Sequence, residues 1–342
     1  MASVRPSTKA RRIGEYLPCP AAVIDWAASV QSAELAAGNL RRLGEILIER
    51  EQITKEELRD ALEIQRVDRL RRCPLFESLS GEDLRTIGAS AEEFTLVAGE
   101  RLLSQDHRGD SLYVVISGRL LIYRRDEHLE GIPAGVAVPG DAVGTADYFT
   151  GGTRSFSACA VEPAALLKIR YDALPESVRL RPDPEARPER GFIDIEEMMD
   201  RLTQRASRIL EADRSTLFLV DPENGDLLSS TATGGGVSEA GQPTAAEFAD
   251  QVLKSGPALT NSEADLGPLF NPETGFQSQD QTRNSLAGPL CSPQGEIIGA
   301  LQVADRRDGP FSPDDALLFR AFTHEVQTAV EDYRQAVKRR RD

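Results

Sequence analysis

The chain has 342 residues, of which 40% are hydrophobic, so it is long enough to form two or three domains with real cores. Its 40 Lys and Arg residues against 55 Asp and Glu residues give a net charge of −15, which makes nucleic acid an unfavourable partner. The four cysteines and three histidines are scattered without metal-binding spacing, as expected of a reducing cytoplasm. No apolar run could span a bilayer, and the basic start lacks the apolar segment of a secretory signal.

The first 69 residues are predicted to be mainly helical. Residues 1–38 are weakly patterned and should form a flexible arm followed by a helix. In residues 39–69, apolar side chains recur at three- or four-residue steps, which is typical of helices. Thr54 followed by Glu57 predicts a capping box at the start of the second helix. This segment is therefore expected to be a helical hairpin.

The hairpin resembles the repeated motif in the N-terminal domain of type II secretion and pilus ATPases, some of which bind cyclic di-GMP. Arg42, Leu43, Gly44 and Gln65 fall on the motif's Arg, Leu, Gly and Gln, so the resemblance implies a dinucleotide motif at these residues. Glu51 replaces the motif's central glycine, at a turn that favours positive φ, and only one copy of a tandem motif is evident. The alternative is a helical adaptor that packs on the next domain or on a partner.

Residues 70–174 carry short strand-like runs separated by glycines, which predicts an antiparallel β-roll. The segment resembles the cyclic nucleotide-binding domain family. The residues that carry the resemblance are Leu75-Phe76, Gly99-Glu100, Asp110-Ser111-Leu112-Tyr113 and Ser117-Gly118. The resemblance implies a regulatory domain whose ligand is cyclic AMP (cAMP) or cyclic GMP (cGMP).

In that family, backbone N–H groups and an arginine hold the cyclic phosphate, and a glutamate binds the ribose hydroxyl. Arg154 falls on the phosphate arginine, but Thr145 occupies the glutamate position, with Asp147 as the nearest carboxylate. The implied site comprises Gly144, Thr145, Ala146, Asp147, Thr153 and Arg154. The loss of one charge-assisted hydrogen bond costs roughly 1.5–3 kcal/mol. The alternative is a retained fold in which Arg154 is structural and pairs with a surface carboxylate. The absence of lid helices before the next segment favours that alternative.

Residues 175–191 contain four prolines and are predicted to be an extended linker. Residues 192–338 then read as α/β, and residues 339–342 are a basic tail. The expected elements are helices at about 194–211, 244–255 and 314–338, with strands at 215–221, 285–291 and 296–305. The apolar stripe of the last helix suits pairing with a second copy of the chain or, alternatively, packing on its own sheet.

The α/β part resembles the GAF domains of cyclic nucleotide phosphodiesterases. The resemblance rests on residues 212–221, Phe270-Asn271, Thr274-Gly275-Phe276 and Thr282-Arg283-Asn284-Ser285-Leu286, and on a closing signature at Asp305, Arg306, Phe311 and Asp315. It implies an ion pair between Arg306 and Asp315 that pins a loop over a ligand pocket. Three substitutions in the signature and a shortened region at 238–244 favour a dimerisation and relay module over a second nucleotide site.

The predicted fold is α+β and multidomain, with a helical hairpin, an antiparallel β-roll and an α/β GAF domain with a central antiparallel sheet. No hydrolase, metalloprotease, Walker or kinase motif is present, so we expect a protein that is not an enzyme and has no cofactor beyond its ligand. The predicted function is a cytoplasmic signalling protein that senses a cyclic nucleotide and relays it as a homodimer to an unknown protein partner. The alternative is a structural adaptor, with degenerate sensor domains, that docks a motor or a secretion ATPase. Nucleic acid and membrane are not expected partners.

Overall fold

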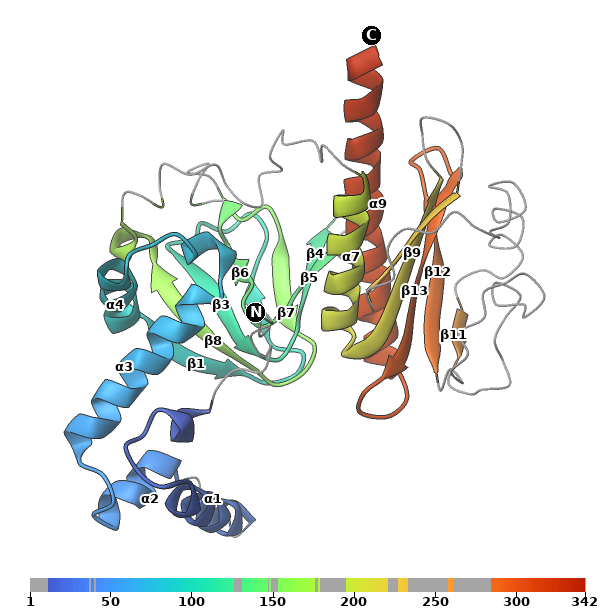
Figure 1. The fold of residues 1–342 in the computed structure, drawn as a ribbon. Helices are drawn as coiled ribbons and strands as arrows, with labels where there is room; N and C mark the ends of the chain where they lie inside the picture. Colours follow the sequence, from blue (N-terminus) through green and yellow to red (C-terminus); the bar gives the residue numbers. More distant parts are fainter. Residues whose placement is uncertain are drawn as a thin grey trace, which may run out of the picture.

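The structure is a computed structural model that describes residues 12–36, 38–39, 41–125, 131–146, 148, 153–175, 178, 195–220, 227–232, 258–260 and 284–341. In chain order, N-terminal helices are followed by two four-stranded sheets and then by a five-stranded sheet with helices. Figure 1 shows helices α7 and α9 standing between the strands of the middle part and the C-terminal sheet. The predicted α+β multidomain fold is confirmed.

The N-terminal helices are α1 (Ala21–Ala36), α2 (Leu43–Glu49) and α3 (Lys55–Arg71). The predicted capping box opens α3: the Glu57 amide donates to Thr54 Oγ1 at 3.1 Å, and the Thr54 amide donates to the Glu57 carboxylate at 2.7 Å. Glu51, in the turn before α3, has a φ of 55°. These helices share a small apolar core that includes Leu47. The far end of α3 leaves this core and packs on the β-roll through Leu70.

The β-roll comprises helix α4 (Gly81–Ser90) and eight strands in two antiparallel sheets. One sheet has the order β1 (Glu92–Leu96), β8 (Ala164–Arg170), β3 (Ser111–Ser117), β6 (Ala142–Val143). The other has the order β2 (Arg101–Leu103), β7 (Ser157–Ala160), β4 (Leu120–Arg125), β5 (Gly131–Ala137). Side chains from both sheets, such as Val115, Leu120 and Leu166, form the core between them.

Gly118 makes the tight turn from β3 to β4. Its φ is +79°, and a Cβ atom there would lie 2.6 Å from the backbone oxygen of Pro163. The turn therefore requires glycine, both for its backbone conformation and for the space available. It places Arg119 at the start of β4, at the side of the roll that faces the C-terminal part.

The C-terminal part has a five-stranded antiparallel sheet, and helices α7 (Ile195–Ile209) and α9 (Pro313–Arg341) lie together on the side of it that faces the roll (Figure 1). The strand order is β10 (Leu227–Thr231), β9 (Ala212–Val220), β13 (Ile297–Arg306), β12 (Ser285–Cys291), β11 (Ala258–Thr260). The predicted helix at 244–255 and almost all of the predicted linker at 175–191 lie outside the described residues.

The apolar stripe of α9 is buried within its own chain. Its residues Leu318, Ala321, Phe322, Val326, Val330 and Tyr333 join the core of the C-terminal sheet. That core also contains Val136 and Val138 of the β-roll, together with Met198 and Leu202 of α7. The two parts are thus joined by continuous apolar packing. This is the own-sheet packing that the sequence left open as the alternative for α9.

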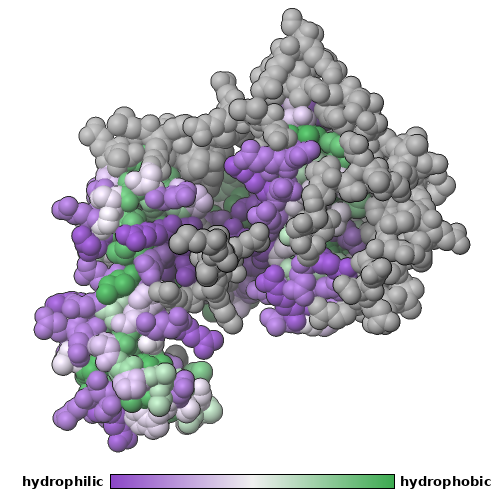
Figure 2. All heavy atoms as spheres, viewed as in Figure 1, coloured by the Kyte–Doolittle hydropathy of each residue, from purple (hydrophilic) through white to green (hydrophobic). Residues whose placement is uncertain are grey.

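The face drawn in Figure 2 is mostly hydrophilic where it is coloured, and hydrophobic atoms are interspersed over the N-terminal helices at the lower left. Among large apolar side chains of the described residues, Trp26, Leu35 and Ile64 of these helices are exposed. Single exposed apolar side chains are common on protein surfaces.

Candidate functional site

The predicted phosphate loop and Arg154 lie together at one edge of the β-roll. Strand β6 ends at Val143, Gly144 follows with a φ of +82°, and Thr145 and Ala146 continue the loop. Thr153 forms an antiparallel bridge with Arg108, which brings the next residue, Arg154, back under the loop. Asp147 lies outside the described residues.

The Arg154 side chain is turned inward and is only 5% exposed. Its Nη1 donates to the Gly144 carbonyl oxygen at 3.0 Å and to the Tyr171 hydroxyl at 2.9 Å. Its Nη2 donates to the Ser111 carbonyl oxygen at 2.6 Å. The Tyr171 hydroxyl in turn donates to the Gly144 carbonyl at 2.7 Å. The guanidinium thus ties the loop to β3 and to the end of β8.

Two glycines make room for this guanidinium. A Cβ atom on Gly109 would lie 2.2 Å from Arg154 Cζ, and one on Gly144 would lie 2.2 Å from Arg154 Nη1. Sequence reasoning treated Gly109 only as a turn residue and missed Ser111 and Tyr171 as partners of Arg154. No local signal in the sequence links them to Arg154, because Ser111 is 43 positions away from it and Tyr171 is 17 positions away.

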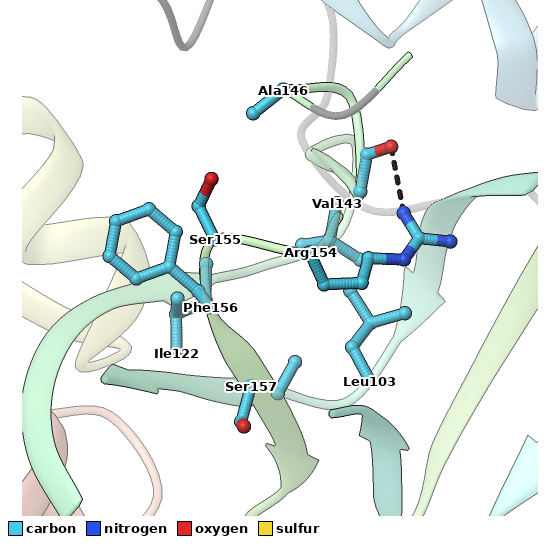
Figure 3. Close-up of a pocket in the computed structure, with 10 residues that line it drawn as sticks. Leu103, Ile122, Val143, Ala146, Arg154, Ser155, Phe156 and Ser157 are labelled. Carbon is cyan, nitrogen blue, oxygen red and sulfur yellow. Dashed lines mark hydrogen bonds between the residues drawn. The ribbon is translucent and has the colours of Figure 1, made fainter. Parts of the chain in front are cut away.

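A small cavity of about 30 Å³, open to solvent, lies beside Arg154 (Figure 3). Its lining is largely apolar, and its polar side chains are those of Arg154, Ser155 and Ser157. In Figure 3, Phe156 and Arg154 lie on opposite sides of the cavity, and the guanidinium reaches the Gly144 oxygen. The cavity therefore presents a cationic side chain beside apolar and aromatic surface.

Thr145 is buried, with 1% of its surface exposed, and its Oγ1 has no hydrogen-bond partner. A buried hydroxyl without a partner costs roughly 1–3 kcal/mol. The sequence resemblance predicted that Thr145 takes the place of a ribose-binding glutamate, and its burial leaves the hydroxyl facing the interior of the roll.

The GAF signature residues gather where β13 ends and α9 begins. Asp305 has a φ of 60° and accepts a hydrogen bond from Arg214 Nε at 2.6 Å. Phe311 is buried in the core of the C-terminal sheet. Arg306 Nε lies 3.1 Å from Asp315 Oδ2, and because this nitrogen has no hydrogen bond, the contact is an ion pair rather than an aligned bond. The residues at 261–283, on which the pocket would depend, lie outside the described part of the chain.

Asp315 also receives an arginine from the β-roll, which sequence reasoning missed. Arg119 Nη1 donates to Asp315 Oδ1 at 2.7 Å and to the Ile209 carbonyl oxygen at 3.2 Å, while its other nitrogens bind Glu162. The Ser312 amide donates to Asp315 Oδ2 at 2.8 Å and caps α9. Burial acts to raise the pKa of Asp315, but the hydrogen bonds from Ser312 and Arg119 outweigh it, and the pKa lies below its ordinary value.

The N-terminal motif residues have local roles. The Arg42 amide donates to Glu45 at 3.0 Å and so begins α2, which Leu43 continues. A Cβ atom on Gly44 would lie 2.6 Å from a Leu58 methyl carbon, so Gly44 allows α2 to approach α3 closely. Gln65 is buried on α3. The resemblance of this hairpin to the secretion ATPases remains a sequence-based hypothesis.

Two general features of the described residues bear on function. No group of three potential ligands among their His, Cys, Asp and Glu side chains is arranged to hold a metal ion. A search of the same residues finds no helix with the length and apolarity that crossing a membrane requires.

Comparison with known proteins identifies two domains. The family model of the cyclic nucleotide-binding domain matches residues 93–179, and that of the GAF domain matches residues 194–330. The chain therefore carries a cyclic nucleotide-binding domain followed by a GAF domain. Both are sensor domains of regulatory proteins, and neither is a catalytic domain.

Similar solved structures include three bacterial regulators. The sensor domain of the transcriptional regulator DNR from Pseudomonas aeruginosa is 25% identical, with 32% of this chain and 75% of that chain covered and a TM-score of 0.31. The N-terminal domain of a transcriptional regulator from Streptomyces coelicolor is 31% identical (31% and 73% covered, TM-score 0.29). The Thermus thermophilus catabolite activator protein is 27% identical (29% and 47% covered, TM-score 0.28), so this chain spans under half of that protein.

Proposed function

We propose that this chain is a non-catalytic signalling protein that binds a cyclic nucleotide, cAMP or cGMP, in its β-roll and relays binding through its GAF domain. The observation that carries the proposal is the position of Arg154, whose guanidinium lies under the Gly144–Ala146 loop at the wall of an open cavity. A cationic side chain beside a largely apolar surface that includes Phe156 suits a ligand with an anionic phosphate and a flat base.

Ligand binding at this site requires Arg154 to exchange partners. Its partners include two carbonyl oxygens and a tyrosine hydroxyl, which are neutral groups. Hydrogen bonds between a guanidinium and a phosphate are roughly twice as strong as bonds between neutral groups, and they are often bidentate. A cyclic phosphate can compete with these neutral groups for Arg154.

The relay to the GAF domain follows from the contacts between the two domains. Arg119 of the roll binds the buried Asp315 at the start of α9, and Val136 and Val138 lie in the GAF core. The proposed homodimer would use surfaces of α9 other than its buried stripe. We place the protein in the cytoplasm, because its four cysteines are free.

Isothermal titration calorimetry with cAMP and cGMP tests the binding step. The wild type should bind one of them, and Arg154→Ala should abolish the heat. Arg170→Ala is the matched control, because Arg170 lies near the same edge but is exposed and pairs only with Asp172 among the described residues. This control should bind as the wild type does. An absence of heat from both the wild type and the control would contradict the proposal.

A second candidate is the structural adaptor that docks a motor or a secretion ATPase. It is favoured by the hydrogen bonds that the Arg154 guanidinium already makes within the protein. A guanidinium that is 5% exposed and bonded to three oxygens already acts as a structural tie. Ligand-induced stabilisation separates the candidates. A nucleotide at 100 times its Kd adds about 2.7 kcal/mol to the free energy of unfolding, whereas an adaptor gains nothing.

A further inference from the structure

Helix α7 of the GAF domain forms hydrogen bonds with the turn of the β-roll that leads into the phosphate loop. Arg205 on α7 donates from Nη2 to the Val136 carbonyl oxygen at 2.9 Å and from Nη1 to Asp141 Oδ2 at 3.1 Å. One helical turn later, Arg208 donates to the Pro139 carbonyl oxygen at 3.2 Å. Three contacts from α7 therefore fall within residues 136–141.

The same arginine also holds α9. Arg205 Nε donates to Glu325 Oε1 at 3.0 Å, so one guanidinium binds a carboxylate of the roll and a carboxylate of the C-terminal helix. The three side chains are all half-buried. A guanidinium is planar and presents its donors in a fixed fork, so its partners cannot shift independently without a loss of hydrogen bonds.

Asp141 connects this arginine to the site. Its Oδ2 accepts the Val138 amide at 3.0 Å, and its carbonyl oxygen accepts the Val115 amide at 2.9 Å, which fixes the turn against β3. Strand β6 follows at once, and Gly144, whose carbonyl oxygen binds Arg154, lies three residues beyond Asp141. The loop and α9 are thus linked through Asp141, Arg205 and Glu325.

We propose that Arg205 is a positioning residue that couples the phosphate loop of the roll to the C-terminal helix α9. A displacement of the loop moves Asp141. Arg205 transmits that displacement to Glu325 and so changes the position of α9 on the sheet. The coupling is a property of the protein without a ligand. Only the identity of the ligand that would displace the loop rests on the proposed function.

Hydrogen exchange of the full chain without nucleotide, followed by mass spectrometry, tests the coupling. Arg205→Gln should speed amide exchange about fivefold or more in peptides that cover 138–146 and in peptides that cover 318–330. Arg201→Gln is the matched control, because Arg201 lies on the same helix in an exposed pair with Glu197. It should change neither region.

A second variant is Glu325→Gln, which leaves every contact of the roll's turn with Arg205 in place but also weakens the direct hydrogen bond from the Val136 amide to Glu325. Its effect on peptides that cover 131–137 is therefore not diagnostic, whereas it should speed exchange at 142–146, residues that Glu325 does not bond, and should have no further effect on 142–146 in an Arg205→Gln background. If Glu325→Gln changes only α9, or if Arg205→Gln changes the loop no more than Arg201→Gln does, the coupling is refuted. Should Arg205→Gln fail to fold, Asp141→Asn replaces it, with faster exchange at 318–330 as the expected result.

These outcomes are independent of nucleotide binding. Coupled exchange in a protein that gives no heat with cAMP or cGMP would leave this inference standing and remove the proposed ligand. Nucleotide binding without coupled exchange would do the reverse.

Discussion

Replacement of Arg119 by methionine should strongly destabilise the protein. Methionine keeps an apolar stem of similar length but removes the guanidinium that joins the roll to the GAF domain. Asp315, which is 0% exposed, then loses its 2.7 Å partner, and the Ile209 carbonyl loses a donor. Removal of one partner of a buried ion pair typically costs about 3–5 kcal/mol. We expect about 3 kcal/mol, because Ser312 and Arg306 still face the Asp315 carboxylate.

Urea denaturation followed by circular dichroism measures this loss as a lower midpoint. Arg59→Met is the matched control, since Arg59 pairs with Glu56 and Asp60 on an exposed face of α3 and should change stability by no more than about 0.5 kcal/mol. The Asp315→Asn variant and the double variant complete a cycle, in which we expect a coupling energy above about 1 kcal/mol. A loss below about 1 kcal/mol for Arg119→Met, the value of an exposed pair, would refute this reasoning.

Three further predictions follow from single residues. The pKa of Asp315 is lower in the folded protein than the value of about 3.9 in the unfolded chain, so its ionised form stabilises the fold above about pH 3.9. This stabilisation is lost as the pH falls through the lower, folded pKa. In urea melts at a series of pH values, the difference in unfolding free energy between wild type and Asp315→Asn should therefore narrow below about pH 4. Glu51→Gly should raise the free energy of unfolding by about 0.5–1 kcal/mol, because glycine relieves a φ of 55° at some entropic cost, and an unchanged or lower denaturation midpoint would contradict this. Gly118→Ala should destabilise by more than about 2 kcal/mol, because it combines a φ of +79° with a 2.6 Å approach to the Pro163 oxygen, and an effect within about 0.5 kcal/mol would contradict it.

Much of the local structure could be predicted from the sequence. The Thr54–Glu57 capping box, the glycine-separated strands of the roll and the long C-terminal helix all depend on residues close together in the chain. Such patterns reflect hydrogen bonds and side-chain periodicities that act within a few residues, so they can be recognised without knowledge of the whole fold.

The candidate site was only partly predictable. Arg154 and the Gly144–Ala146 loop were identified from their resemblance to a family, and the structure brings them together. The inward orientation of Arg154 was not foreseen, because it depends on Ser111 of β3 and on Tyr171, which follows β8. The missing partner of Thr145 Oγ1 is likewise a property of the packed core and not of the loop sequence.

The sequence by itself determined the order of the two sensor domains and the type of the main described elements, and it pointed to Arg154 as the arginine of the candidate site. Only the tertiary structure decided what joins the domains. Arg119 and Asp315 are 196 positions apart, and Arg205 and Asp141 are 64 apart. At such separations the neighbouring sequence does not indicate which arginine pairs with which carboxylate, because each side chain can face solvent equally well until packing buries it. The apolar stripe of α9 left two partners open for the same reason, and the folded sheet and strand β5 decided which one covers it.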